Sequence, residues 1–283
     1  MKPETQPVPP GTEISGPATA LLPSPWAHVI HKPLFIAFLL CFAFGWTTLV
    51  LGASPDWPWI DPLLWTLAAA ASMVGLSRRL PEQNVLMSAA IIAGLSLGIA
   101  IVGDRTAIPY GPRVYSDHLG GWILGVPWPV PLMWIAIIVT GRGVARLIMR
   151  PWRKTTYYGF WVIGLTCLLA LWLDIGLEPF AARVKRYWLW QASPDVWHWH
   201  SAPWTNFLGW FVTAVSILGF TTPWLINKQP VKQPTDYHPL VVWLLLNFYF
   251  ATGNALHQMG SAAGLSLAGC AIATVYAVRG ARW

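Results

Sequence analysis

Two acidic side chains, Asp174 and Glu178, lie four residues apart at the end of an apolar stretch. At this spacing two carboxylates share one face of a helix. An acidic group at membrane depth is costly and is a functional candidate by default. Two neighbouring carboxylates in a dry setting cannot both ionise easily, so we expect one to keep its proton and act as a general acid. The structural alternatives are a salt bridge to Arg113 or Arg183, or exposure at the membrane surface.

The helix that carries this pair is expected to end beside it. Pro179 directly follows Glu178, and a residue before proline is disfavoured in a helix. The pair is therefore predicted at the rim of its helix. Asn206, at the entry of a later span, is a further polar side chain that could orient a water molecule or cap its own helix.

A second polar segment, Pro109–Trp134, interrupts the apolar spans with the sequence PYGPRVYSDHLGGWILGVPWPVPLMW. Irregular polar backbone at membrane depth is tolerated only where it is buried in protein or lines a cavity. Within it, Asp117 and His118 accompany two tyrosines and an arginine, Tyr110, Tyr115 and Arg113. These side chains could supply a second acid, a base for water or a clamp for a polar group. Alternatively, the acidic and basic groups satisfy one another and the turn backbone.

Aromatic residues gather in another block, Asp174–Trp210. Tryptophan prefers the membrane–water interface, but its faces also stabilise cations and offer flat apolar surface to a conjugated ligand. The block contains Trp188, Trp190, Trp197, Trp199, Trp204 and Trp210. It also holds a His-x-His pair, His198 and His200, which would need a third ligand from elsewhere to bind a metal. An interfacial aromatic stretch is the favoured interpretation, and no metal site is predicted.

The composition indicates which elements must position these groups. The chain is 55% hydrophobic and 10% charged, whereas soluble domains carry about 25% charged residues. We predict an all-α fold, a polytopic transmembrane bundle of about eight spans, with seven as the alternative. The expected spans are about Leu34–Ala53, Pro62–Leu76, Val85–Val102, Pro129–Leu147, Tyr157–Asp174, Thr205–Leu225, Pro239–Ala251 and Ser261–Val278.

The basic residues predict an orientation. With eight spans, 13 of the 18 lysines and arginines fall on the face that holds both termini, and five fall on the other. The positive-inside rule then places both termini in the cytoplasm, with the chain in the cytoplasmic (inner) membrane. Both polar blocks fall on the opposite face. The net charge of +7 reflects this bias at helix ends, so the bilayer rather than nucleic acid is the expected partner.

The chain is expected to form one transmembrane domain over residues 33–283. The preceding residues 1–32 are polar and proline-rich and lack the apolar run of a signal peptide, which predicts a disordered cytoplasmic tail. Gly260–Gly264, GSAAG, has the small-xxx-small pattern of close helix packing, within the fold or between subunits. Three cysteines lie far apart in apolar spans and are read as small buried hydrophobes.

The motifs, in their order, resemble the carotenoid biosynthesis protein family. The resemblance rests on PYGPRVYSDHLGG, GVPWPVPLMW, DIGLEP, YWLW and APWTNFLGW, and it extends from about Ile101 to Trp224. This family contains membrane carotenoid 1,2-hydratases, including an archaeal bisanhydrobacterioruberin hydratase. The resemblance implies addition of water to the terminal C=C bond of an acyclic carotenoid end group, giving a tertiary alcohol without a redox cofactor.

This resemblance implies roles for the residues above. Asp174, partnered by Glu178, is the first choice for the acid, and Asp117 is the second. Tryptophan or tyrosine faces would stabilise the tertiary cation, and the water would be held by a nearby polar side chain. The residues implied in substrate and water binding are Tyr110, Arg113, Tyr115, His118, Trp188, Trp190, Asn206 and Trp210.

Two positions depart from the family pattern. Ala100 stands where members usually carry a glutamate, and Ala107 stands in place of a glycine. Two alternatives follow: another isoprenoid end-group reaction, such as isomerisation or cyclisation, or carotenoid binding without catalysis. A transporter is disfavoured because the halves show no repeated broken helices. Expected partners are an acyclic carotenoid and the bilayer, with a homo-oligomer or pathway enzymes as further options.

Overall fold

The computed structural model describes residues 25–52, 59–226 and 234–283. In these ranges, eight helices are long and apolar enough to cross a membrane. The prediction of an all-α bundle with eight spans is confirmed. The helices are α1 (Pro25–Val50), α2 (Ile60–Ser77), α3 (Glu82–Thr106), α4 (Pro129–Ile148), α5 (Tyr158–Pro179), α6 (Trp204–Leu225), α7 (His238–Leu256) and α8 (Gly260–Ala281).

The first helix begins earlier than expected. It starts at Pro25, so residues 25–32, predicted to be disordered, form its first two turns. Proline suits the first turn of a helix because its missing N–H would have no partner there. Pro33 lies inside α1, as membrane helices tolerate. The rest of the expected tail, residues 1–24, lies outside the described residues.

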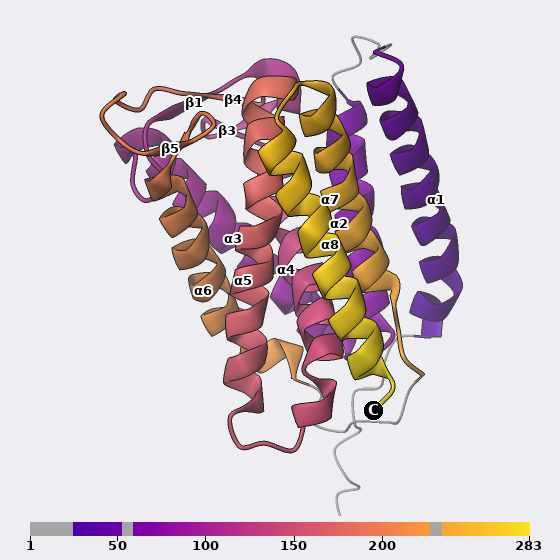
Figure 1. The fold of residues 1–283 in the computed structure, drawn as a ribbon. Helices are drawn as coiled ribbons and strands as arrows, with labels where there is room; N and C mark the ends of the chain where they lie inside the picture. Colours follow the sequence, from indigo (N-terminus) through magenta and orange to yellow (C-terminus); the bar gives the residue numbers. More distant parts are fainter. Residues whose placement is uncertain (1–24, 53–58, 227–233) are drawn as a thin grey trace, which may run out of the picture.

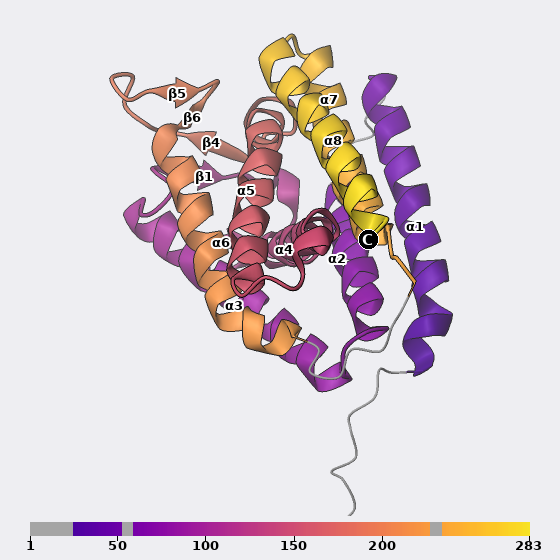
Figure 2. The ribbon, with the colours of Figure 1, turned by 60° about the horizontal axis from the view of Figure 1, so that its bottom comes forward.

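Helix α4 occupies the centre of the bundle. It packs against α2, α3, α5, α7 and α8, and its side chains are buried on nearly every face. Helix α1 lies at the edge, against α2 and α7, and α3 pairs with α6 on the other side (Figure 1, Figure 2). Helix α4 is therefore the most enclosed of the eight described helices, and the others surround it.

Short strands form a cap at one end of the bundle, opposite the end where α8 finishes (Figure 1). All three sheets have two antiparallel strands. They are β1 (Arg113–Tyr115) with β4 (Trp188–Trp190), β2 (Trp122–Ile123) with β3 (Val126–Pro127), and β5 (His198–Trp199) with β6 (Ala202–Pro203). The β1–β4 pair joins the two polar blocks, Pro109–Trp134 and Asp174–Trp210, which most of α4 and most of α5 separate in the sequence.

Close packing of α8 uses glycines other than those of the GSAAG motif. A Cβ atom at Gly260 or Gly264 would meet nothing within 4 Å, so the two glycines of this motif make no close contact inside the fold, whereas Ala262 and Ala263 between them are buried. Instead, Gly269 lies against the Trp172 indole, and Gly280 lies against the backbone carbonyl of Leu147. Contact of the GSAAG face with another subunit stays a prediction.

Candidate functional site

Helix α5 carries both carboxylates in its last turns, and the backbone remains helical beyond them. After α5 ends at Pro179, a π-helical turn, Phe180–Val184, continues it. The α-helix thus ends one residue after the predicted end at Glu178, but the π-helical turn continues the segment, so the prediction that the pair sits at its rim is wrong. Both Asp174 and Glu178 have 0% of their surface exposed, which also excludes exposure at the membrane surface.

The helical backbone continues past Pro179 because a side-chain donor replaces the hydrogen bond that proline cannot make. Proline has no N–H to donate to the carbonyl four residues earlier, which is that of Ile175. The indole N–H of Trp199 donates to this carbonyl at 3.0 Å. Beyond the proline, the Lys185 N–H bonds the carbonyl of Phe180, the five-residue step of a π-helix. Trp199 thus keeps the carboxylates inside the helix.

Asn206 of α6 bridges the two carboxylates. Its Nδ2 donates to Asp174 Oδ2 at 2.9 Å and to Glu178 Oε2 at 3.2 Å. A side-chain amide has two N–H groups and can serve both acceptors at once. The cap of α6 is Pro203, so helix capping, the alternative role for Asn206, is wrong.

Two tryptophans from β4 complete the coordination of Glu178. The indole N–H groups of Trp188 and Trp190 donate to Glu178 Oε1 at 2.7 and 2.5 Å. Side chains alternate between faces along a strand, and Leu189 between them is 54% exposed. Glu178 therefore accepts three N–H bonds. Asp174 accepts one, and its Oδ1 is buried without a hydrogen-bond partner among the described residues.

Arg113 places a positive charge inside an aromatic cage. Its Cζ lies 4.4 Å from the ring centre of Tyr110 and 4.9 Å from that of Tyr115. Its Nη2 donates to the Tyr115 hydroxyl at 2.6 Å. Burial acts to lower the pKa of Arg113, but the two tyrosines and the nearby carboxylates outweigh it and raise the pKa. The guanidinium therefore stays cationic.

The predicted salt-bridge alternatives are absent among the described residues. Arg113 donates to Tyr115 rather than to a carboxylate, and Arg183 donates to the carbonyl of His200 at 3.0 Å. The pair is instead held by neutral N–H donors, with the cation of Arg113 close by.

Tyr110 holds the cage between two helices. A Cβ atom at Gly103 of α3 would lie 2.9 Å from its ring, and one at Gly209 of α6 would lie 2.6 Å from it. Only glycine leaves room for the ring on both sides. The Tyr110 hydroxyl bonds Thr213 Oγ1 at 2.8 Å, and burial raises its pKa. The ring thus connects the segment Pro109–Trp134 to α3 and α6.

A small cavity of about 20 Å³ lies inside this cage. Such a volume holds about one water molecule. Its wall contains Arg113 and the rings of Tyr110, Tyr115, Trp134, Trp188 and Trp210, together with the methyl group of Ala100. Trp134 stacks on Trp210 with ring centres 4.5 Å apart. Trp134 was not among the expected site residues, although it is the last residue of the segment Pro109–Trp134.

The structure does not bring Asp117 and His118 to this cavity. Both are exposed in a 3₁₀ turn, Asp117–Leu119, that follows β1. Asp117 Oδ1 accepts the indole N–H of Trp122 at 3.1 Å, and His118 Nδ1 bonds Ser116 Oγ at 3.1 Å. Their contacts are local, but the alternative in which Asp117 pairs with Arg113 is wrong, because Arg113 donates to Tyr115. The other predicted residues, Asp174, Glu178, Tyr110, Arg113, Tyr115, Trp188, Trp190, Asn206 and Trp210, gather in one cluster.

The fold and the cluster define an integral membrane protein of eight helices with a buried acidic site. Its sequence matches the model of the carotenoid biosynthesis protein family over residues 60–275, and the chain belongs to that family. The matched region begins with α2 and contains every residue of the cluster. No solved structure matches the chain significantly.

A curated relative gives a more specific likeness. The bisanhydrobacterioruberin hydratase of Haloarcula japonica is 28% identical over 127 residues, which is 44% of this chain. The match spans 41% of the relative, so the chain covers less than half the length of that hydratase.

Proposed function

We propose that this protein hydrates the terminal C=C bond of an acyclic carotenoid end group, with Asp174 as the proton donor. The observation that carries the proposal is the fully buried pair, in which Asp174 has a free oxygen and Glu178 has none. The family and the hydratase relative support the reaction class.

The hydrogen bonds assign different roles to the two carboxylates. N–H donors favour the ionised form of an acceptor, and Glu178 accepts three of them while Arg113 supplies a positive charge nearby. Two like charges on adjacent turns of a buried helix repel each other strongly. Glu178 is therefore the anion of the pair, and Asp174 carries the proton on its unpartnered Oδ1.

The reaction then needs no oxidant or reductant. The Asp174 proton forms the new C–H bond with the electron pair of the C=C bond, leaving a tertiary cation on the other carbon. Electron-rich faces of Trp134, Trp188 and Trp210 line the cavity and can stabilise that cation. A water oxygen forms the C–O bond and releases one proton, which restores Asp174. The product is the alkene plus one water.

The cavity has a size suited to the water rather than to the whole substrate. About 20 Å³ accommodates about one water molecule, and Arg113 and the Tyr115 hydroxyl in its wall can hold one. A carotenoid end is much larger, so its entry must widen the cavity. The Trp134–Trp210 stack is the wall that we propose to move.

Expression of the chain in cells that make lycopene tests the proposal. The pigments, analysed by mass spectrometry, should include a product heavier by one water. Asp174→Asn should abolish it. Asp117→Asn is the matched control, because Asp117 is acidic but exposed, and it should leave the product unchanged. An unaltered pigment profile with well-expressed protein and several acyclic substrates would contradict the proposal.

Ala100 supports a second candidate, a carotenoid-binding protein without catalysis. Its methyl group lines the cavity where family members usually carry a glutamate, and it is 1% exposed. Purified protein that carries a coloured and chemically unaltered carotenoid, with no hydrated product, would favour this candidate over the hydratase.

We propose that both termini face the cytoplasm. The end of the bundle where α8 finishes also holds the α2–α3 and α4–α5 connections, whose basic residues fit the cytoplasmic side. A fluorescent protein fused to the C-terminus should fold and emit, whereas alkaline phosphatase fused there should be inactive. The opposite pattern would reverse the orientation.

A further inference from the structure

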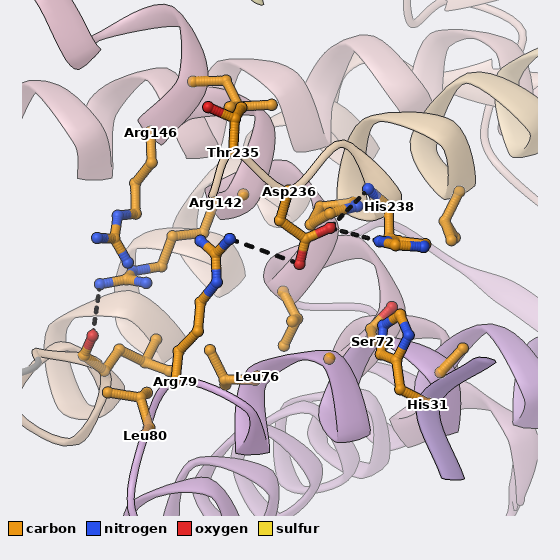
Figure 3. A pocket seen from close by; sticks show the side chains of 18 of the residues that line it. His31, Ser72, Leu76, Arg79, Leu80, Arg142, Arg146, Thr235, Asp236 and His238 are labelled. Atoms are coloured by element: carbon orange, nitrogen blue, oxygen red, sulfur yellow. Dashed lines mark hydrogen bonds and ion pairs between the residues drawn. The ribbon is translucent and has the colours of Figure 1, made fainter. Parts of the chain in front are cut away.

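A second and much larger cavity lies at the other end of the bundle, away from the strands (Figure 3). Its volume is about 490 Å³. Side chains from α1, α2, α4, α7 and the adjoining connections form its wall. Arginines dominate the polar part of this wall: Arg79, Arg142, Arg146, Arg150 and Arg153.

A single carboxylate, Asp236, faces these arginines among the described residues of the wall. Its Oδ2 lies 3.7 Å from Arg79 and 3.6 Å from Arg78, and its Oδ1 bonds His238 Nδ1 at 2.5 Å. Asp236 is thus already shared among three side chains on one side of the cavity. The remaining arginines have no carboxylate partner among the described residues.

The hydrogen bonds of these arginines go to neutral groups. Arg142 Nη2 donates to the carbonyl of Leu225 at 2.8 Å, and Arg150 Nη1 donates to Thr235 Oγ1 at 2.6 Å. Figure 3 shows the guanidinium groups of Arg142 and Arg146 side by side, across the cavity from His238. Each guanidinium offers five N–H donors, so several remain to bind an anion.

Most of the remaining wall is apolar. Phe35, Leu76, Leu80, Val139, Leu147 and Val242 line it. Planar guanidinium groups match phosphate oxygens in a bidentate geometry. Basic pockets between membrane helices at the cytoplasmic side are typical binding places for phosphate head groups of lipids. A cavity that combines arginines with an apolar wall suits a ligand with a phosphate at one end and a hydrocarbon chain at the other.

We propose that this cavity binds a phosphate or diphosphate group. The group can come from the head of an anionic lipid or from a soluble phosphate compound. The proposal rests on the arginines and is independent of the hydratase reaction, which uses the opposite end of the bundle.

The test uses the full-length protein in two kinds of bilayer disc. In discs of phosphatidylcholine alone, binding of inorganic phosphate and pyrophosphate is measured by calorimetry. In discs that also contain phosphatidylglycerol, the enrichment of that lipid on the extracted protein is measured by mass spectrometry. Arg146→Gln and Arg153→Gln are the test variants, because both side chains are exposed and their loss should not affect folding, which thermal unfolding checks.

Arg282→Gln is the matched control. Arg282 is an exposed arginine at the C-terminus, outside the cavity wall, so it reports non-specific charge attraction. Each test variant should weaken binding about five-fold, the effect of one basic residue near an anionic surface. The control should change the affinity less than two-fold, because surface substitutions have small energetic effects.

The outcomes separate the two sources of phosphate. If the test variants lose phosphatidylglycerol enrichment and Arg282→Gln keeps it, the site is supported with a lipid ligand. If the test variants lose pyrophosphate binding and Arg282→Gln keeps it, the site is supported with a soluble ligand. Equal effects of Arg282→Gln and Arg146→Gln, or no binding by the original protein in either arm, overturn the proposal.

Discussion

The two ends of this bundle handle charge in opposite ways. Under the strands, Asp174 and Glu178 are completely buried and accept hydrogen bonds from Asn206 and two indoles. At the other end, five arginines surround an open cavity that contains one carboxylate among the described residues. We call the first, with its buried carboxylates and a cavity of about 20 Å³, the acidic end, and the second, with its arginines and a cavity of about 490 Å³, the basic end.

The two ends are therefore suited to different tasks. Burial strengthens every electrostatic interaction and raises the cost of any unpaired group, so the acidic end suits proton transfer within a fixed geometry. An excess of positive charge around about 490 Å³ suits attraction of an anion, which salt will screen. The largest effects on chemistry are therefore expected at the acidic end, and effects on anion binding are expected at the basic end.

The largest effect is expected at the acidic end. Asp174→Asn removes the proposed proton donor while keeping the size and the hydrogen bond to Asn206. Hydration should fall by roughly 10²–10⁴-fold, the usual contribution of a general acid. Product formation per amount of purified protein measures this loss. Activity similar to that of Asp117→Asn would break the assignment of Asp174.

At the basic end, the expected effect of removing the carboxylate is on stability. Burial acts to raise the pKa of Asp236, but the hydrogen bonds from His238 and the charge of Arg79 outweigh it and lower the pKa to about 2. A pKa lowered from about 3.9 in the unfolded chain stabilises the fold by about 2–3 kcal/mol at neutral pH. Asp236→Asn should lose this amount in unfolding experiments.

The pH dependence of that effect has a defined sign. The contribution of Asp236 is complete above its unfolded pKa of about 3.9 and is lost as the pH falls through about 2. The stability difference between the original protein and Asp236→Asn should therefore shrink in strong acid. Asp195→Asn, an exposed acidic control, should be neutral. A difference that is absent at neutral pH would contradict the ion pairing at this end.

A smaller effect is expected from an indole at the acidic end. Trp190→Phe removes one N–H donor from Glu178. Hydrogen bonds to charged groups contribute about 1.5–3 kcal/mol, and the lower value is expected because Trp188 still donates to the same oxygen. Thermal unfolding in detergent measures the loss. Trp197→Phe, at a tryptophan that is 64% exposed, is the matched control and should lie near zero.

The smallest expected effect is on stability, and it comes from two threonines near opposite ends of α6. Thr213→Val removes the hydroxyl that bonds Tyr110 and should cost about 1 kcal/mol of stability. Thr221, two turns further along α6, bonds only the Ile217 carbonyl of its own helix in the described structure. Thr221→Val should therefore be nearly neutral in the same unfolding measurement. Equal losses in the two variants would show that Tyr110 is not anchored by Thr213.

The bundle itself could be predicted because its spans depend on composition alone. Eight apolar stretches of bilayer length are visible in the sequence, and α1 to α8 correspond to them. Boundaries were less accurate where proline is involved. Pro179 predicts a helix end, but Trp199, 24 residues from the carbonyl that it bonds, restores the lost hydrogen bond. A partner so distant in sequence leaves no local signal.

Only part of the candidate site could be predicted, because contacts between residues distant in sequence leave no local signal there either. Unusual polar and aromatic residues mark both blocks, but only the β1–β4 register decides which of them point inward. It directs Arg113 and Tyr115 toward Trp188, while Asp117 and His118 lie beyond the strand and remain exposed. The arginine cavity was not predicted. Its arginines come from α4 and from separate connections, and each alone fits the orientation of membrane helices.

The central claim, proton donation and addition of water at the acidic end, is tested most directly by isotope labelling. Purified protein is incubated with lycopene in deuterated water that contains heavy oxygen, and the product is analysed by mass spectrometry. The account predicts one carbon-bound deuterium and one heavy oxygen atom for each hydrated end, and neither in Asp174→Asn. Recovery of unlabelled lycopene, or the same labelled product from Asp174→Asn, would contradict it.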